Sequence, residues 1–289
     1  MLESILVIGL MRSGVYAMLA IGFSLIFGVA KILNLSHTAF YMIATYIIYV
    51  FTVNLGITPM LAILISIGIT VLLGMFFYKT VIEPVREHET TVIITTVAIA
   101  LLLQEVLLLF FGGHYRGVSA IIPGHSTLLG IRVTNQYILT FLVVFVFLAI
   151  LWYILMKTRL GLAIRSSAQD REIANLMGID VPKVASITVL IALILSAVAG
   201  AMMAPIYVIE PHMWLDPLII VLAVVILGGL GSIKGSFIGA FILGFAEVLV
   251  VSLVPGGSFL KLAMALALME VILLIKPEGL FGVSIEGER

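Results

Sequence analysis

The sequence predicts an all-α, polytopic membrane protein with about nine transmembrane helices, within a range of eight to ten. Of its 289 residues, 63% are hydrophobic and only 10% are charged, and the mean hydropathy is +1.31. Soluble domains are nearer 45–50% apolar and about 25% charged. A soluble protein of this size exposes too much surface to hide so many apolar side chains. Lipid is therefore the expected solvent for most of the chain.

The remaining composition excludes several other classes of protein. Fifteen basic residues balance fifteen acidic residues, so the chain has no excess positive charge to attract a nucleic acid. Cysteine is absent, which excludes disulfides, thiol nucleophiles and cysteine metal ligands. The five histidines show no close metal-ligand spacing. We therefore predict no catalytic, cofactor-binding or metal-binding residues.

Four apolar runs lie in the first half of the chain. A hydrocarbon core of about 30 Å needs roughly 20 apolar residues, and backbone polar groups in lipid must be paired within helices. The stretch from Thr38 to Tyr78 has no charged residue and is too long for one span, so the turn signal at 54–59 divides it. The four predicted helices are 5–30, about 38–53, about 59–80 and about 91–111.

Five further apolar runs follow in the second half. A loop rich in Gly, His and Ser is predicted from Gly112 to Asn135, and the longest charged segment extends from Lys157 to Lys183. Polar residues at 210–216 mark another boundary. The five predicted helices are 136–156, 184–209, 217–230, 237–254 and 260–275. Residues 1–289 are thus expected to form a single transmembrane domain.

The distribution of Lys and Arg predicts the orientation in the plasma membrane. Cytoplasmic loops carry an excess of these residues. With 157–184 in the cytoplasm, alternation leaves only Arg116, Arg132 and Lys261 outside, and places Arg12 inside the first span. The cytoplasmic set then comprises eleven residues: Lys31, Lys79, Arg86, Lys157, Arg159, Arg165, Arg171, Lys183, Lys234, Lys276 and Arg289. This predicts an N-terminus outside and a C-terminus in the cytoplasm.

The charged segment at about 157–184 predicts two short amphipathic helices. Ile164, Ala168, Ile173 and Met177 fall near helical spacing, with charges on the other positions. Gly178 is a candidate helix stop. Each helix has a small apolar face, which either a partner subunit or the bundle of the chain itself can cover. The residues alone leave both interpretations open.

Several stretches resemble the branched-chain amino-acid permease family of ABC importers. Glu172-Ile-Ala174, three residues and then Gly178 resemble part of the EAA loop of ABC-importer permeases, and 165–179 resembles the corresponding loop of this family. Residues 34–42, 227–239 and 276–282 resemble it in the same order along almost the whole chain. Within the family, Phe40-Tyr41-Met42 favours the LivH-type membrane subunit.

This resemblance implies an importer with two membrane subunits, two ATPases and an extracellular solute-binding protein. A sister permease or a second copy would complete the membrane part, and transport would proceed by alternating access. Leucine-like amino acids are the default solute, while urea and other small amides remain open. The coupling loop to the ATPases would comprise Arg165, Gln169, Asp170, Glu172, Ala174, Met177 and Gly178.

The sequence agrees with the expectation that ATP is bound and hydrolysed by other subunits. A phosphate-binding P-loop requires Gly-Lys followed by Ser or Thr, and the chain contains no Gly-Lys pair. We therefore expect the chain to bind no cofactor and ATP to be used by the partner subunits.

Polar residues within the apolar runs are candidates for a translocation pathway or for structural contacts. Ionisable groups at membrane depth usually face a cavity or a partner. Glu247 has apolar neighbours on both sides, and Gln104 and Glu105 lie near the outer end of their span. Asn34 can cap the following helix, and His37 can bond to free backbone groups. Arg12 is expected to reach the membrane surface by snorkelling.

A glycine cluster precedes the eighth predicted helix. The cluster consists of Gly228, Gly229, Gly231, Gly235 and Gly239. The four-residue spacing of the last three permits close approach of helices. A tight turn between two helices is favoured over a re-entrant element that lines the pathway.

Two other functions remain as alternatives at this point. A stand-alone secondary transporter or channel would use Glu105 and Glu247 as proton or cation sites. A purely structural membrane subunit would have no pathway at all.

Overall fold

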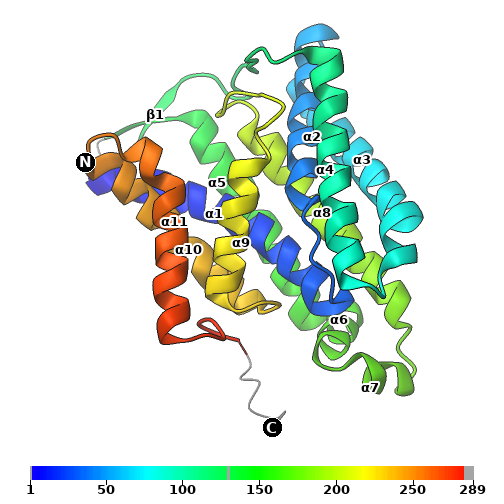
Figure 1. The fold of residues 1–289 in the computed structure, drawn as a ribbon. Coiled ribbons are helices and arrows are strands. Elements are labelled where there is room, and N and C mark those ends of the chain that lie inside the picture. Colours follow the sequence, from blue (N-terminus) through cyan, green and yellow to red (C-terminus); the bar gives the residue numbers. More distant parts are fainter. Residues whose placement is uncertain (1, 129–130, 283–289) are drawn as a thin grey trace.

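The computed structural model describes residues 2–128 and 131–282 and is almost entirely helical (Figure 1). Its α-helices are α1 (Leu2–Ala30), α2 (His37–Tyr49), α3 (Pro59–Phe77), α4 (Glu89–Phe111), α5 (Asn135–Lys157), α6 (Arg159–Gln169), α7 (Arg171–Leu176), α8 (Val181–Met203), α9 (Leu215–Gly228), α10 (Ile233–Leu253) and α11 (Gly257–Ile275). Short π-helical turns extend α2 through Val50–Asn54 and α3 through Tyr78–Ile82, and a 3-10 turn covers Glu83–Val85.

The prediction of a polytopic helical membrane protein is confirmed. Every apolar run proposed from the sequence contains a helix. In the described part of the chain, seven helices are long and apolar enough to cross a bilayer, and α9 is a shorter apolar helix. The predicted run 184–209 is too long, because α8 ends at Met203. Pro205 explains this end, because a proline has no backbone N–H to continue the helical hydrogen bonds.

Helix α1 crosses the centre of the molecule obliquely and is almost wholly buried (Figure 1, dark blue). It packs mainly against α10 and α8. Its contacts with α10 use small residues: Ser24 hydrogen-bonds to Ser236, and a Cβ at Gly244 would lie 2.4 Å from Ser13 Oγ. Small residues at helix interfaces let backbones approach in a lipid environment, where hydrophobic burial does not favour helix association.

The outer helices present one apolar side outward. In α3 the buried residues recur every fourth position, at Ala62, Ser66, Thr70 and Gly74, and α3 packs against α8. Apolar side chains such as Leu64, Leu72 and Phe76 lie on the exposed side of the same helix. Helix α11 is the most exposed of the seven long apolar helices. These faces suit contact with lipid or with another membrane subunit.

The predicted loop from Gly112 to Asn135 contains a small β-hairpin. Strands β1 (His125–Leu128) and β2 (Ile131–Thr134) pair antiparallel, with His125 opposite Thr134. Arg116 in the same loop pairs through its backbone with Ile209, in the connection between α8 and α9. This end of the molecule is therefore more ordered than the sequence indicated.

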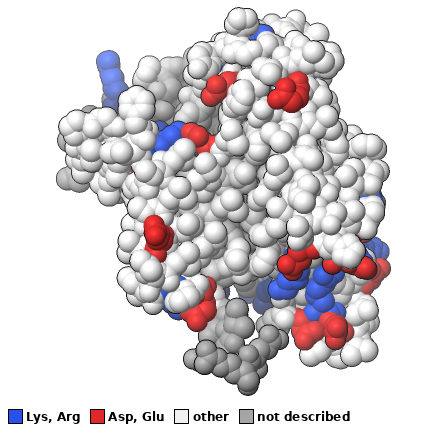
Figure 2. All heavy atoms as spheres, in the orientation of Figure 1, with Lys and Arg blue, Asp and Glu red and all other residues white. Residues whose placement is uncertain are grey.

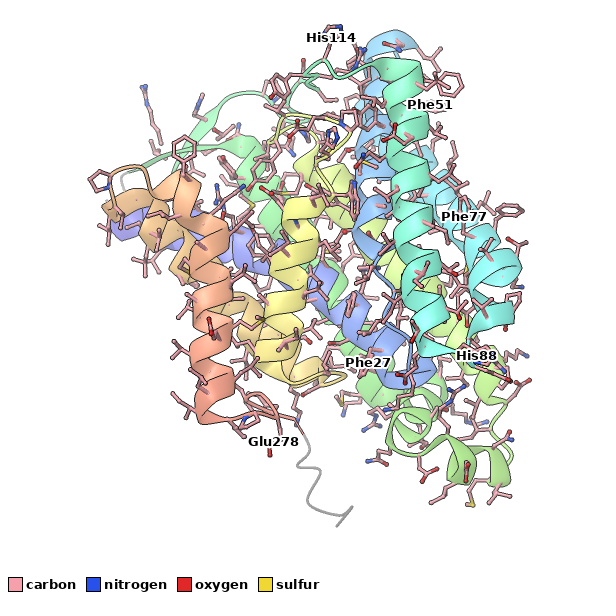
Figure 3. The ribbon with its side chains drawn as sticks, in the orientation of Figure 1. Phe27, Phe51, Phe77, His88, His114 and Glu278 are labelled. Carbon is pink, nitrogen blue, oxygen red and sulfur yellow. The ribbon has the colours of Figure 1, made fainter. Side chains whose placement is uncertain are left out.

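The bundle has two chemically different ends. We call the end with α6 and α7 the α6 end, and the opposite end the hairpin end. Helix α4 joins them, with His88 just before it at the α6 end and His114 just after it at the hairpin end (Figure 3). Figure 2 shows charged side chains gathered mainly at the α6 end of the visible face, below a largely uncharged middle.

Candidate functional site

Two short capped helices form the α6 end, as the sequence predicted. The Thr158 side chain accepts a hydrogen bond from Gly161 N at the start of α6. Asp170 accepts from Ile173 N at 2.9 Å and so caps α7. Gly178 has a φ of +82°, a left-handed conformation that glycine adopts without steric cost. Local capping therefore fixes both helices even though each is short.

Helix α6 is covered by the chain itself. Ile164 and Ser167 are buried, and α6 packs against α5, α1 and α8. Gly161 lies so close to α5 that a Cβ there would be 2.2 Å from the Ile154 carbonyl oxygen. For α6 the structure thus favours an ordinary helix packed on its own bundle.

Helix α7 is different, because its apolar residues point away from the bundle. Ile173, Leu176 and Met177 are 59%, 86% and 79% exposed. Ala174 is 3% exposed and faces inward, so this position of the predicted coupling loop is not available to a partner. The Arg171 side chain donates to the Ala30 carbonyl at the end of α1, which ties α7 to the central helix.

The other predicted coupling residues lie on the surface around α7. Gln169, Asp170, Glu172 and Gly178 are exposed, and Arg165 is half-buried. Exposed apolar residues surrounded by polar ones are typical of protein interaction surfaces. We call Ile173, Leu176 and Met177 together the α7 patch.

A buried charge cluster lies deep in the bundle. Glu247 on α10 is 3% exposed and forms an ion pair with Arg12 on α1. Tyr16, one turn further along α1, donates to the second Glu247 oxygen at 2.6 Å. The guanidinium of Arg12 also lies 5.9 Å from the ring centre of Tyr207, a residue of the α8–α9 connection. Burial raises the pKa of the Tyr207 hydroxyl to about 12. The Glu247 charge is thus fully compensated.

The pairing of Arg12 corrects the expectation that this residue snorkels to the membrane surface. The pairing of Arg12 with Glu247 was not predicted, although the sequence contains an indication of it. Arg12 is seven residues from the outer end of the first predicted run at Ile5, and Glu247 is seven residues from the outer end of its run at Val254. Opposite charges at equal depth on two helices indicate a pair, because an isolated charge at that depth is costly.

A cavity of about 360 Å³ lies beside this cluster, towards the hairpin end. Glu247 and Tyr16 form part of its wall. The α8–α9 connection, with Tyr207, Glu210 and His212, forms another part. Small-molecule sites in proteins have volumes of about 300–1,000 Å³.

Gln104 and Glu105 do not join this cavity. The Gln104 side chain is buried and accepts from Trp214 Nε1 at 2.8 Å. Glu105 lies on the exposed side of α4, where Gln104 Nε2 donates to it at 3.2 Å. The two candidate carboxylates, Glu105 and Glu247, therefore do not form one common site.

Asn34 and His37 connect neighbouring helices. Asn34 Oδ1 accepts from Ser36 N at 3.1 Å, but the N-cap of α2 is Ser36, so the prediction that Asn34 caps this helix is wrong by two residues. The buried His37 Nε2 lies 3.1 Å from the Leu19 carbonyl oxygen of α1. The His37 ring fits beside Gly22, where a Cβ would come within 3.0 Å of it.

The glycine cluster forms the favoured tight turn, between α9 and α10. Gly229 and Gly231 have φ values of +102° and +80°. A Cβ at Gly228 would lie 2.3 Å from the backbone carbon of Gly235, and one at Gly239 would lie 2.8 Å from the Val224 carbonyl oxygen. Only glycine permits this contact between the two helices.

Comparisons with known proteins agree with these features. Residues 5–275 match the family model described as "Branched-chain amino acid transport system / permease component". The permease protein BraD of Pseudomonas aeruginosa is 28% identical, over 96% of this chain and 94% of that protein. The permease protein LivH of Escherichia coli strain K12 is 27% identical, over 95% and 93%. Both are named as high-affinity branched-chain amino-acid transport system permeases.

A solved structure shares the fold. It is PsaBC from Streptococcus pneumoniae in complex with Fab, with a TM-score of 0.54, 15% identity, and coverage of 96% of this chain and 94% of that one. The helical bundle, the capped α6–α7 unit and the full-length match to the family model lead to one conclusion. The chain belongs to the family of permease components of branched-chain amino-acid transport systems.

Proposed function

We propose that this chain is the membrane subunit of an ATP-driven importer that moves branched-chain amino acids by alternating access. The α7 patch is the docking surface for a partner ATPase. The observation that carries this proposal is the exposure of Leu176 and Met177 on a capped helix that is tied to α1. Its partners are two ATPases, a sister permease or second copy, and an extracellular solute-binding protein.

The positions of the cations support a cytoplasmic α6 end. Lys157 ends α5 and Lys183 lies in the first turn of α8, so these cations flank the α6–α7 unit. The positive-inside rule then places this end in the cytoplasm, with α1 starting outside. On this orientation, the seven long apolar helices of the described residues and the shorter α2 and α9 serve as nine spans.

Helix α1 supplies a route for movement between the two ends. Arg171 holds α7 against the last turn of α1, and Arg12 on the same helix pairs with Glu247 near the hairpin end. Displacement of α7 by a closing ATPase would therefore shift a rigid helix that reaches the 360 Å³ cavity. Such coupling requires that the contacts of α7 differ between the two states of the transporter.

Coupled uptake into proteoliposomes tests this function. The complete importer should accumulate leucine only with ATP. Leu176→Glu with Met177→Glu should reduce ATP-dependent uptake at least tenfold, because it places two charges in an apolar contact. Glu87→Lys, an exposed residue in the α3–α4 connection, is the control and should retain uptake. Normal ATP-dependent uptake by the double variant would disprove docking through α7.

A further inference from the structure

The lining of the cavity near Glu247 changes from apolar at its floor to charged at its rim. Its floor consists of residues that are 8% exposed or less: Val15, Tyr16, Leu19, Tyr41, Met203 and Ile220. Its rim carries the charged and polar side chains of Glu210, His212, Asp216 and Lys261, which are exposed or half-buried. The cavity is therefore apolar and aromatic inside and charged at its mouth.

The charges at the rim are of both signs. Lys261 at the start of α11 pairs with Asp216 at the start of α9. Glu247 is paired with Arg12. Within the described residues Glu210 forms no ion pair, so its carboxylate has no cation in direct contact. The mouth of the cavity thus favours a cationic group beside Glu210, while Lys261 has two further ammonium hydrogens for an anionic group.

The side chain of Tyr41 forms part of the cavity wall. Tyr41 is 3% exposed and lines the cavity. In the part of the chain that the structure describes, its hydroxyl makes no hydrogen bond, in contrast to that of Tyr16. The Tyr41 hydroxyl is therefore available to a polar group that enters the cavity.

We propose that this cavity within a single subunit binds one aliphatic amino acid as its zwitterion. The ammonium group lies beside Glu210, the carboxylate lies beside Lys261, and the aliphatic side chain lies against Leu19 and Ile220. The inference rests on the proposed function, since it assigns a place in this chain to the transported solute. It adds a solute contact in the membrane subunit, besides any in the solute-binding protein.

Direct binding tests the site without ATP or partner subunits. Purified full-length chain in lipid nanodiscs should bind radiolabelled leucine saturably. Two competitors test the two charged groups of leucine separately: 4-methylpentanoate lacks the ammonium group and 3-methylbutylamine lacks the carboxylate. Each should compete at least tenfold more weakly than unlabelled leucine, because each lacks one of the two charged contacts proposed for leucine. Equal competition by all three would overturn the assignment.

Charge variants should change the ranking of the ligands in opposite ways. Glu210→Gln should weaken the binding of leucine and of 3-methylbutylamine roughly tenfold and leave that of 4-methylpentanoate unchanged, because it removes a charge-assisted hydrogen bond to the ammonium group. Lys261→Met should weaken leucine and 4-methylpentanoate and leave the amine unchanged. Glu87→Gln, an exposed carboxylate outside the cavity, is the matched control. Loss of all ligands alike in both rim variants would contradict the proposed orientation.

Filling the cavity gives an independent test. Ile220→Trp should abolish leucine binding, whereas Ile238→Trp, on α10 and outside this cavity, should preserve it. Gel filtration and thermal unfolding verify that both variants are folded. If Ile220→Trp does not fold, Glu210→Gln provides the test of the site instead. Retained binding in a folded Ile220→Trp variant would overturn the proposal.

The assembled importer separates this proposal from the proposed function. Leucine should bind the resting complex as it binds the chain alone. Binding to the lone chain but not to the complex would show that another subunit occupies the cavity, and would overturn the solute assignment. ATP-dependent leucine uptake without any binding here would refute the site alone. Absence of ATP-dependent uptake would refute the proposed function instead.

Discussion

At the scale of single residues, several polar side chains inside the bundle pair with partners that are distant along the chain. Glu247 pairs with the guanidinium of Arg12 and accepts a hydrogen bond from the phenol of Tyr16. Gln104 accepts a hydrogen bond from the indole N–H of Trp214, and Ser24 hydrogen-bonds to Ser236. The sequence identified Glu247 and Gln104 as polar groups at membrane depth but gave no partner for them. The partners lie 235 and 110 residues away along the chain, so pairing depends on which helices become neighbours.

The ion pair between Arg12 and Glu247 should stabilise the fold through compensation of charge. Glu247→Leu leaves Arg12 without its partner and should lower the free energy of unfolding by about 3–5 kcal/mol. The double variant Arg12→Met with Glu247→Leu removes both charges and should recover most of this loss. Thermal unfolding of the purified chain in detergent measures both variants. A double variant as unstable as the single one would show that the pair is not the source of the stability.

At the scale of secondary-structure elements, apolar runs and caps predicted the helices well. The short α6 and α7 and the stop at Gly178 follow from helical periodicity and local capping. The π-helical extensions of α2 and α3 and the β-hairpin were not predicted. The sequence also treated α6 and α7 alike, whereas one face of α6 is buried against the bundle and the apolar residues of the α7 patch are exposed. That difference arises from α6 packing on α5, α1 and α8, which no local pattern encodes.

The contact between α9 and α10 should depend on its glycines. Gly235→Ala should destabilise the chain by at least about 2 kcal/mol, because a Cβ there would lie 2.0 Å from the Gly228 carbonyl oxygen. Gly68→Ala, in the middle of α3, is the control, since nothing lies within 4 Å of its added Cβ. It should be neutral or stabilising by up to about 1 kcal/mol. Equal unfolding temperatures for the two variants would contradict this packing.

At the scale of the whole molecule, the balance of cations predicts the orientation. We expect the α6 end in the cytoplasm and the hairpin end outside. The natural chain has no cysteine, so single cysteines report on their own position without background. His114→Cys should react with a membrane-impermeant maleimide in intact cells, and His88→Cys should react only after permeabilisation. Both histidines are exposed and lie at opposite ends of α4. The reverse pattern would invert the proposed topology.

Cross-linking at Met177 tests the central claim most directly, namely that the α7 patch docks an ATPase. Met177→Cys introduces the sole thiol of the chain at a position that is 79% exposed. In the assembled importer a short thiol-to-amine cross-linker should join it to the ATPase subunit, and ATPase binding should slow its reaction with maleimide at least tenfold. Maleimide labelling at the same rate with and without the ATPases, and no cross-link, would contradict the account.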